Sequence, residues 1–240
     1  MKCILSDFRR AITGRWFLVA IFASALALWL SIGSETWYFF DMLQEGDAPD
    51  WVSFLQSALS GQIGLLLLPA LSALPCGAEA LGEIRSGAFR SVIFRTGRKT
   101  YIAGQVLACY VSGLLVQLCA FAVLIGFLTV VTVAAGGAFM PFAALLELAP
   151  PLLGRMLCGG GWALIGCTVA LLSETASAAM IAPLCLCYAL TMIATRFFPN
   201  AAMLNPVNWQ HAPLLVLTVA ACVLLVATGA TLYWEVQKHV

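Results

Sequence analysis

The feature that most constrains this chain is a long segment without a single charged side chain. From Thr100 to Leu146 the sequence contains no Asp, Glu, Lys or Arg. The chain as a whole is 62% hydrophobic and only 10% charged. A soluble domain of 240 residues cannot bury that much apolar surface. The sequence therefore predicts a protein whose solvent is the lipid bilayer.

Apolar runs on both sides of this segment extend the pattern. A transmembrane helix needs roughly 20 apolar residues, so we expect an all-α membrane fold with six transmembrane helices in a single domain over residues 1–240. The expected spans lie at about 16–34, 55–78, 101–134, 152–172, 176–198 and 212–234. Gly136-Gly137 is expected to end the third span, and Pro150-Pro151 to open the fourth. The acidic segment 35–50 is expected to be an outer loop.

Residues 2–15 have a different pattern. Ile4, Leu5, Phe8 and Ile12 recur at helical spacing, and most of the charged residues lie on other faces. This pattern predicts an N-terminal amphipathic helix that lies in the headgroup plane instead of crossing the membrane. The alternative is a basic tail that only sets the orientation.

The cations are distributed unevenly around the spans. Cytoplasmic loops of membrane proteins carry an excess of Lys and Arg. With a cytoplasmic N-terminus, ten of the twelve cations fall on the cytoplasmic side: Lys2, Arg9, Arg10, Arg15, Arg85, Arg90, Arg95, Arg98, Lys99 and Lys238. Arg155 and Arg196 are the exceptions. We therefore expect a multi-pass protein of the cell membrane, namely the bacterial cytoplasmic membrane, with both termini cytoplasmic.

The segment from Glu83 to Lys99, EIRSGAFRSVIFRTGRK, has a helical pattern in addition to its positive charge. Its apolar residues fall on one helical face, and they are Ile84, Ala88, Phe89, Val92 and Ile93. Gly97 is a suitable stop signal. The segment predicts a short cytoplasmic amphipathic helix between the second and third spans. Two interpretations remain open: a helix lying on anionic headgroups, or a helix that docks a cytosolic partner.

Particular residues of this segment make the chain resemble a known family. They are Glu83, Gly87, Phe89, Ile93, Thr96, Arg98 and Tyr101. The pair Asn205-Pro206 precedes the last expected span. Together with a basic N-terminal helix and six spans, this layout resembles the membrane permease subunit of a type-2 ABC (ATP-binding cassette) exporter.

The resemblance implies a function and a set of partners. In that family the loop after the second span contains a coupling helix, which contacts a separate ATP-binding subunit. The docking residues implied here are Glu83, Ile84, Arg85, Phe89, Arg90, Val92 and Ile93. The expected partners are two ATP-binding subunits, a second permease chain that is identical or homologous, and membrane lipids, with no nucleic acid. The expected activity is export of a substrate such as a peptide antibiotic, a drug or a lipid.

The chain contains no motif of its own for ATP hydrolysis or other catalysis. A P-loop requires G-x-x-x-x-G-K-[ST], and Gly82 and Gly87 have the glycine spacing without the Lys that must follow. Neither H-E-x-x-H nor G-x-S-x-G occurs. Cys185 and Cys187 have no His or carboxylate nearby to complete a metal site. We therefore expect no catalytic residue, metal or cofactor in this chain, with ATP and Mg²⁺ held by the partner subunit.

Two cations fall near the expected outer surface, Arg155 in the fourth span and Arg196 at the end of the fifth. One interpretation is that both side chains reach outward to lipid phosphates. Another is an outer gate, in which Arg155 or Arg196 pairs with Glu147 or Glu35.

Other functions are compatible with the same layout. A secondary transporter would need charged or polar groups at mid-membrane and internal repeats, and the sequence indicates neither. A non-transporting membrane anchor or assembly subunit for an ATPase is a further alternative. Substrate-stimulated ATPase activity would distinguish a transporter from such an anchor.

Overall fold

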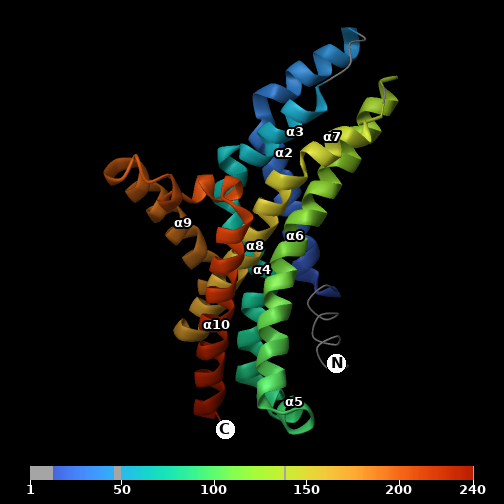
Figure 1. Ribbon diagram of the computed structural model, residues 1–240. Coiled ribbons are helices and arrows are strands. Elements are labelled where there is room, and N and C mark those ends of the chain that lie inside the picture. Colours follow the sequence, from blue (N-terminus) through green and yellow to red (C-terminus); the bar gives the residue numbers. More distant parts are fainter. Residues whose placement is uncertain (1–12, 46–49, 138, 240) are drawn as a thin grey trace.

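The computed structural model describes residues 13–45, 50–137 and 139–239, which are mostly helical and include no strand (Figure 1). The helices are α2 (Arg15–Glu45), α3 (Trp51–Ser60), α4 (Gln62–Ser86), α5 (Ala88–Thr96), α6 (Arg98–Ala134), α7 (Phe142–Glu147), α8 (Ala149–Ser173), α9 (Ala178–Phe197) and α10 (Leu214–His239). Two short 3₁₀ turns, η1 (Ala202–Leu204) and η2 (Pro206–His211), connect α9 to α10. The amphipathic helix predicted at residues 2–15 lies almost wholly outside the described residues.

In the described part of the chain, six helical segments are long and apolar enough to cross a membrane. They are Arg15–Gly33, Gln62–Ser86, Arg98–Ala134, Ala149–Ser173, Ala178–Phe197 and Leu214–Lys238. Five of them match the predicted spans to within a few residues. The second begins at Gln62 and not near residue 55. The prediction of an all-α chain with six helices of transmembrane length is therefore confirmed.

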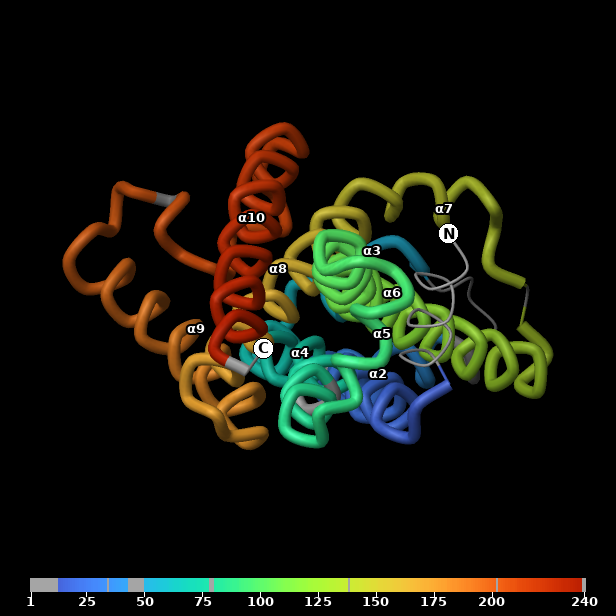
Figure 2. Tube along the Cα trace, turned by 90° about the horizontal axis from the view of Figure 1, so that it is seen from below, coloured from blue at the N-terminus to red at the C-terminus, as the bar shows by residue number. Residues whose placement is uncertain are grey.

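The helices form a bundle with two distinct ends. The α5 end holds α5 and the last turns of α10, and the α7 end holds α3 and α7 (Figure 1). Seen from the α5 end, α4, α6 and α8 lie at the centre, α2 and α10 lie beside them, and α9 projects to one side (Figure 2). The strong contacts of α4 and α6 with α8 agree with this arrangement.

The predicted outer loop 35–50 is largely helical instead. α2 continues through a non-helical residue, Gly33 (φ 6°, ψ −74°), as far as Glu45. α3 begins at Trp51, where the carboxylate of Asp50 accepts hydrogen bonds from the backbone N–H of Val52 (3.2 Å) and Ser53 (3.3 Å). The hydrogen bonds from Ser53 keep the pKa of Asp50 below its usual value. This is a helix N-cap, and it fixes the start of α3.

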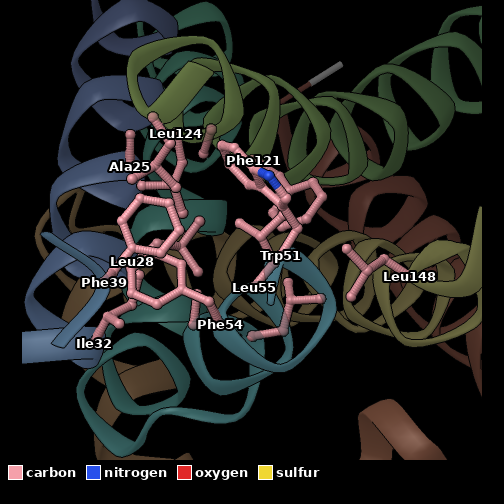
Figure 3. Packing of buried hydrophobic residues seen from close by; sticks show 14 of the residues in the cluster. Ala25, Leu28, Ile32, Phe39, Trp51, Phe54, Leu55, Phe121, Leu124 and Leu148 are labelled. Carbon is pink, nitrogen blue, oxygen red and sulfur yellow. The ribbon is translucent and has the colours of Figure 1, made fainter. Parts of the chain in front are cut away.

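An aromatic core explains why this region folds instead of remaining a loop. Phe39 of α2 stacks on Phe54 of α3, with ring centroids 4.5 Å apart, and meets Trp51 edge-on at 5.4 Å. The same cluster continues into α6 through Phe121 and reaches Leu148 at the junction of α7 and α8. Figure 3 shows the aromatic side chains of α2, α3 and α6 gathered together, with Leu148 to one side. Burial of these aromatic side chains stabilises the packing of α2 against α3.

The junction between α6 and α8 agrees with the expected break. α6 ends at Ala134, and Gly136 adopts a left-handed conformation (φ 82°) that glycine tolerates best. The N–H of Gly137 then bonds to the carbonyl of Thr132 (2.9 Å). Pro150 and Pro151 occupy the first turn of α8, where no backbone N–H needs an intrahelical partner.

Candidate functional site

The short helix α5 is bounded by two glycines in the left-handed half of backbone space. Gly87 has φ 70° and Gly97 has φ 81°. The N–H of Gly87 bonds to the carbonyl of Ile84 (3.1 Å), and that of Gly97 to the carbonyl of Ile93 (2.9 Å). Positive φ is accessible to glycine at little cost. The chain therefore turns sharply at both ends of α5, and the single helix expected from residue 84 is broken at Gly87.

The apolar face of this segment points into the protein. Ile84 and Phe89 are buried, with Phe89 only 1% exposed, and Val92 and Ile93 pack against the same cluster. The cluster also contains residues of α6 and α10, namely Tyr101, Ile102, Val106, Cys109, Leu232 and Val236. The chain's own helices thus cover the face expected to meet a partner. The sequence interpretation placed Phe89 at an interface, and this placement is corrected.

The outward face of α5 is basic and carries one bare aromatic ring. Phe94 is 91% exposed. Arg90 and Arg95 are also exposed on this helix, together with Ser91. An isolated exposed apolar residue needs no explanation, but an aromatic ring flanked by arginines has the composition of an interface anchor. Phe94, Arg90 and Arg95 therefore form the candidate docking surface at the α5 end.

Glu83 and Arg85, also expected in the docking set, hold the end of α4 in place. The hydroxyl of Tyr101 on α6 donates to a carboxylate oxygen of Glu83 (3.2 Å). The guanidinium of Arg85 donates to the backbone carbonyl of Glu174 in the turn between α8 and α9. Both contacts orient the α4–α5 junction, and so they position the candidate docking surface.

The side chain of Arg155 lies neither at the outer surface beside lipid phosphates nor in the expected outer gate. The side chain is buried, with 2% exposure, and does not reach the surface. Its Nη1 donates to the carbonyl of Leu59 (2.6 Å), its Nη2 to the carbonyl of Gly64 (3.2 Å), and its Nε to Oε1 of Gln117 (3.3 Å). The interpretation of Arg155 as a side chain that reaches outward to lipid phosphates is wrong.

The polar cluster around Arg155 connects five helices. Nε2 of Gln117 on α6 donates to the hydroxyl of Ser72 on α4 (2.8 Å). The hydroxyl of Ser31 on α2 accepts from the N–H of Gly64 (2.7 Å) and donates to the carbonyl of Ala27 (2.7 Å). Together with Leu59 on α3 and Arg155 on α8, these groups link the helices at the break between α3 and α4. We call this set the Arg155 cluster.

The helix break explains why an arginine is buried there. Gly61 between α3 and α4 has extended backbone angles (φ −62°, ψ 136°), so the last carbonyls of α3 lack helical partners. Away from water, freed carbonyls need another donor, and the C-terminus of a helix attracts a cation. A guanidinium offers five N–H groups in one plane, so Arg155 serves several acceptors at once.

A small cavity beside Arg155 limits what the cluster can bind. Its volume is about 20 Å³, and its walls include Gln210 and Thr191. Pockets for organic ligands have volumes of roughly 300–1,000 Å³, whereas this one has room for about one water molecule. The geometry therefore indicates a structural role for the Arg155 cluster and not a substrate site.

The residues of the expected outer gate do not meet around Arg155. Glu35, Glu147 and Arg196 are all exposed, on α2, α7 and α9 respectively. Glu35 lines a hollow of about 360 Å³ between α2 and α3, together with Tyr38 and Asp50. Since Arg155 instead bonds neutral oxygens, the expected pairing of Arg155 with Glu35 or Glu147 is absent among the described residues.

The sequence analysis does not predict three residues of the Arg155 cluster and the candidate docking surface. Gln117 and Ser72 were not considered, although amide and hydroxyl groups inside an apolar span are a signal for internal hydrogen bonding. Phe94 does not fit the helical spacing that places Phe89 on the expected docking face, so the pattern does not predict it there. An aromatic residue outside the apolar face of a short amphipathic helix is the signal that could have identified Phe94.

The comparisons with known proteins add no family to these observations. No protein-family model matches the chain, and no curated protein matches it. Among the described residues, no group of three or more His, Cys, Asp or Glu side chains could hold a metal ion. The fold defines the class at a general level: a helical chain with six helices suited to crossing a membrane, consistent with a multi-pass membrane protein.

Proposed function

We propose that this chain is the transmembrane permease subunit of an ATP-driven exporter of the ABC type, and that α5 docks a separate ATP-binding subunit. The observation that carries the proposal is the exposed ring of Phe94 between two exposed arginines, on a helix that projects at one end of a six-helix bundle. Interfaces commonly bury a central aromatic residue and surround it with charged groups. The ATPase groove would accept Phe94, and acidic residues at its rim would meet Arg90 and Arg95.

The distribution of charge supports a cytoplasmic position for this surface. The described cations of α4, α5 and α10, and those in the first turn of α6, all lie at the α5 end. By the positive-inside rule this end faces the cytoplasm, where ATP is available. Both termini would then be cytoplasmic, and the membrane would be the cell membrane. ATP and Mg²⁺ would be bound by the partner, because this chain has no P-loop.

The exposed apolar helices support assembly with a second permease chain. α10 exposes most of its apolar side chains, including Leu215, Val219 and Val223, and α9 is also largely exposed. Lipid covers such faces in part. A second copy, or a homologous chain, would cover the rest and enclose a substrate path with the first. A peptide antibiotic, a drug or a lipid remains the proposed class of substrate.

One observation favours a second candidate, a secondary transporter. Arg155 is a buried charge within a helix of transmembrane length, and such residues often mark ion or substrate paths. Its three hydrogen bonds all go to the chain's own oxygens, however, and this favours the structural role. Transport in proteoliposomes that is driven by an ion gradient without ATP would support this candidate. A chain that holds an ATPase but moves no substrate would be a membrane anchor.

The test of the proposed docking surface is a pair of matched substitutions. Phe94→Ala removes the exposed ring at the α5 end, and Phe142→Ala removes a ring that is 78% exposed at the α7 end. The full-length protein is purified from its own membranes, and photolabelling with an azido-ATP analogue measures the ATP-binding subunit recovered per permease. We expect Phe94→Ala to lose roughly tenfold or more of the recovered subunit. Phe142→Ala should retain all of it.

Two results would contradict the proposal. If Phe94→Ala and Phe142→Ala retain equal amounts of an ATP-binding subunit, α5 is not the docking surface. If the wild-type protein retains no ATP-binding subunit in mild detergent but transports substrate in response to an ion gradient, the chain is a secondary transporter. Arg90→Ala gives a finer check, since a rim charge should weaken binding less and more strongly as salt rises.

A further inference from the structure

An apolar groove runs along the outside of the bundle between α6 and α10. Its volume is about 490 Å³. The walls are formed by the first turns of α6 and the second half of α10, which lie side by side (Figure 1). The lining residues are Lys99, Ile102, Ala103, Val106, Leu107, Leu225, Val226, Gly229 and Tyr233. The groove therefore lies between two helices of transmembrane length, on the outside of the described bundle.

One end of the groove is basic. Lys99 lines it and is exposed. Next to it, the guanidinium of Arg98 lies 4.3 Å from the ring centroid of Tyr233 and donates to the carbonyl of Tyr233 (3.2 Å). The Nε of Arg98 is buried and has no hydrogen-bond partner among the described residues. No Asp or Glu is among the residues that line the groove, and nearby Glu235 pairs with Lys238 (2.8 Å).

We propose that this groove binds an anionic phospholipid of the surrounding bilayer. One acyl chain lies along the apolar walls, and the phosphate lies between Lys99 and Arg98. Both cations are in the first turn of α6, at the start of the helix of transmembrane length, which is the level of the lipid headgroups. Basic pockets between transmembrane helices recognise anionic headgroups in this way. The inference rests on the groove and its charge, and does not depend on the proposed function.

The charge at the groove favours a lipid over a helix from a second copy of the chain. A second helix that filled the groove would cover Lys99, and burial of an unpaired ammonium is costly. A phosphate neutralises that charge and still leaves the lysine stem against apolar atoms. The shape agrees, because Lys99 lines the groove at the start of α6, and Arg98 lies beside it against Tyr233, another lining residue.

The test fills the groove without disturbing the core. A Cβ at Gly229 would meet no atom within 4 Å, and the same is true at Gly126, which is exposed in the other half of α6. Gly229→Leu therefore places a side chain in the groove, and Gly126→Leu is the matched control. Lys99→Gln removes the charge, and Arg95→Gln removes an exposed charge of α5 that does not line the groove.

The probes are dioleoylphosphatidylglycerol and dioleoylphosphatidylcholine, titrated into the full-length protein in detergent and counted by native mass spectrometry. We expect the anionic lipid to bind more tightly than the zwitterionic one. Lys99→Gln should weaken its binding roughly fivefold, and Gly229→Leu roughly tenfold. Gly126→Leu and Arg95→Gln should stay within about twofold of the wild type.

Each of three outcomes would overturn the proposal. The first is equal binding of the two lipids by the wild-type protein. The second is a Gly229→Leu variant that binds as Gly126→Leu does while both melt at the wild-type temperature. The third is a Gly229→Leu variant whose dimer population falls while lipid binding is unchanged, which would assign the groove to a second copy. If Gly229→Leu does not fold, the comparison of Lys99→Gln with Arg95→Gln decides alone.

Discussion

Each end of α4 is a helix break at a glycine. A buried arginine stabilises one break, and a buried phenylalanine stabilises the other. At Gly61, between α3 and α4, the buried guanidinium of Arg155 donates to backbone carbonyls on both sides of the break. At Gly87, between α4 and α5, the buried side chain is Phe89, and Arg85 and Arg90 are exposed. A cation thus lies inside the protein at one break and outside it at the other.

Access to water explains the difference. Leu59 and Gly64, which flank the α3–α4 break, are both buried, so a side chain supplies hydrogen bonds to their carbonyls. At the α4–α5 break Arg85, Ser86 and Ala88 are exposed, and the carbonyl of Gly87 accepts from the N–H of Arg90 (3.1 Å). Water reaches the remaining polar groups there. Apolar packing by Phe89 is then sufficient to hold α5 against the bundle.

The largest expected effect is the loss of Arg155. Arg155→Met has a similar length but leaves the carbonyls of Leu59 and Gly64 and the amide of Gln117 without their donor. Each unsatisfied buried acceptor costs about 1–3 kcal/mol, so we expect the free energy of unfolding to fall by about 4 kcal/mol. Equilibrium unfolding in mixed micelles measures this change.

Arg196→Met serves as the control for this substitution, because Arg196 is exposed at the end of α9. It should change the free energy of unfolding by less than about 0.5 kcal/mol. Equal stability of Arg155→Met and the wild type would show that the Arg155 cluster does not hold the break. That result would return Arg155 to the list of candidates for a transport path.

The next effect concerns the two phenylalanines of α5. Phe89→Ala empties a fully buried position, and we expect a loss of about 3 kcal/mol in the free energy of unfolding. Phe94→Ala removes an exposed ring and should cost less than about 0.5 kcal/mol. Thermal unfolding in detergent compares the two variants directly. A Phe94→Ala variant as unstable as Phe89→Ala would mean that Phe94 is packed in the isolated chain.

The smallest expected effect is the difference in stability between alanine substitutions at Gly61 and at Gly87. A Cβ at Gly61 would collide with the side chain of Ser31, whereas at Gly87 it would meet nothing within 4 Å. Gly61→Ala should therefore cost about 2 kcal/mol through steric overlap, and Gly87→Ala about 1 kcal/mol through its positive φ. The two unfolding midpoints are compared under one condition. The reverse order would indicate that α2 moves away from Gly61 easily, and that the first break is the softer one.

Local signals predicted much of the architecture. Apolar runs located the helices of transmembrane length, and Gly97 and Gly136 mark helix ends in the sequence as they do in the structure. The region of residues 35–50, expected to be an outer loop, lies between the first two helices of transmembrane length but is largely helical. Its buried aromatic side chains gain their stability from α3 and α6, which a local pattern does not reveal.

The sequence by itself determined the six apolar segments of transmembrane length and the helix ends near Gly97 and Gly136, because hydropathy and glycine conformation are local properties. Only the tertiary structure decided which way each side chain faces. The helical period places Phe89 and Phe94 on different faces of α5, and the position of α6 and α10 buries the face of Phe89. Arg155 likewise could reach outward or inward along α8, and the carbonyls left open at Gly61 draw it inward. These choices depend on neighbours far away in the sequence, which the helical period of one segment does not contain.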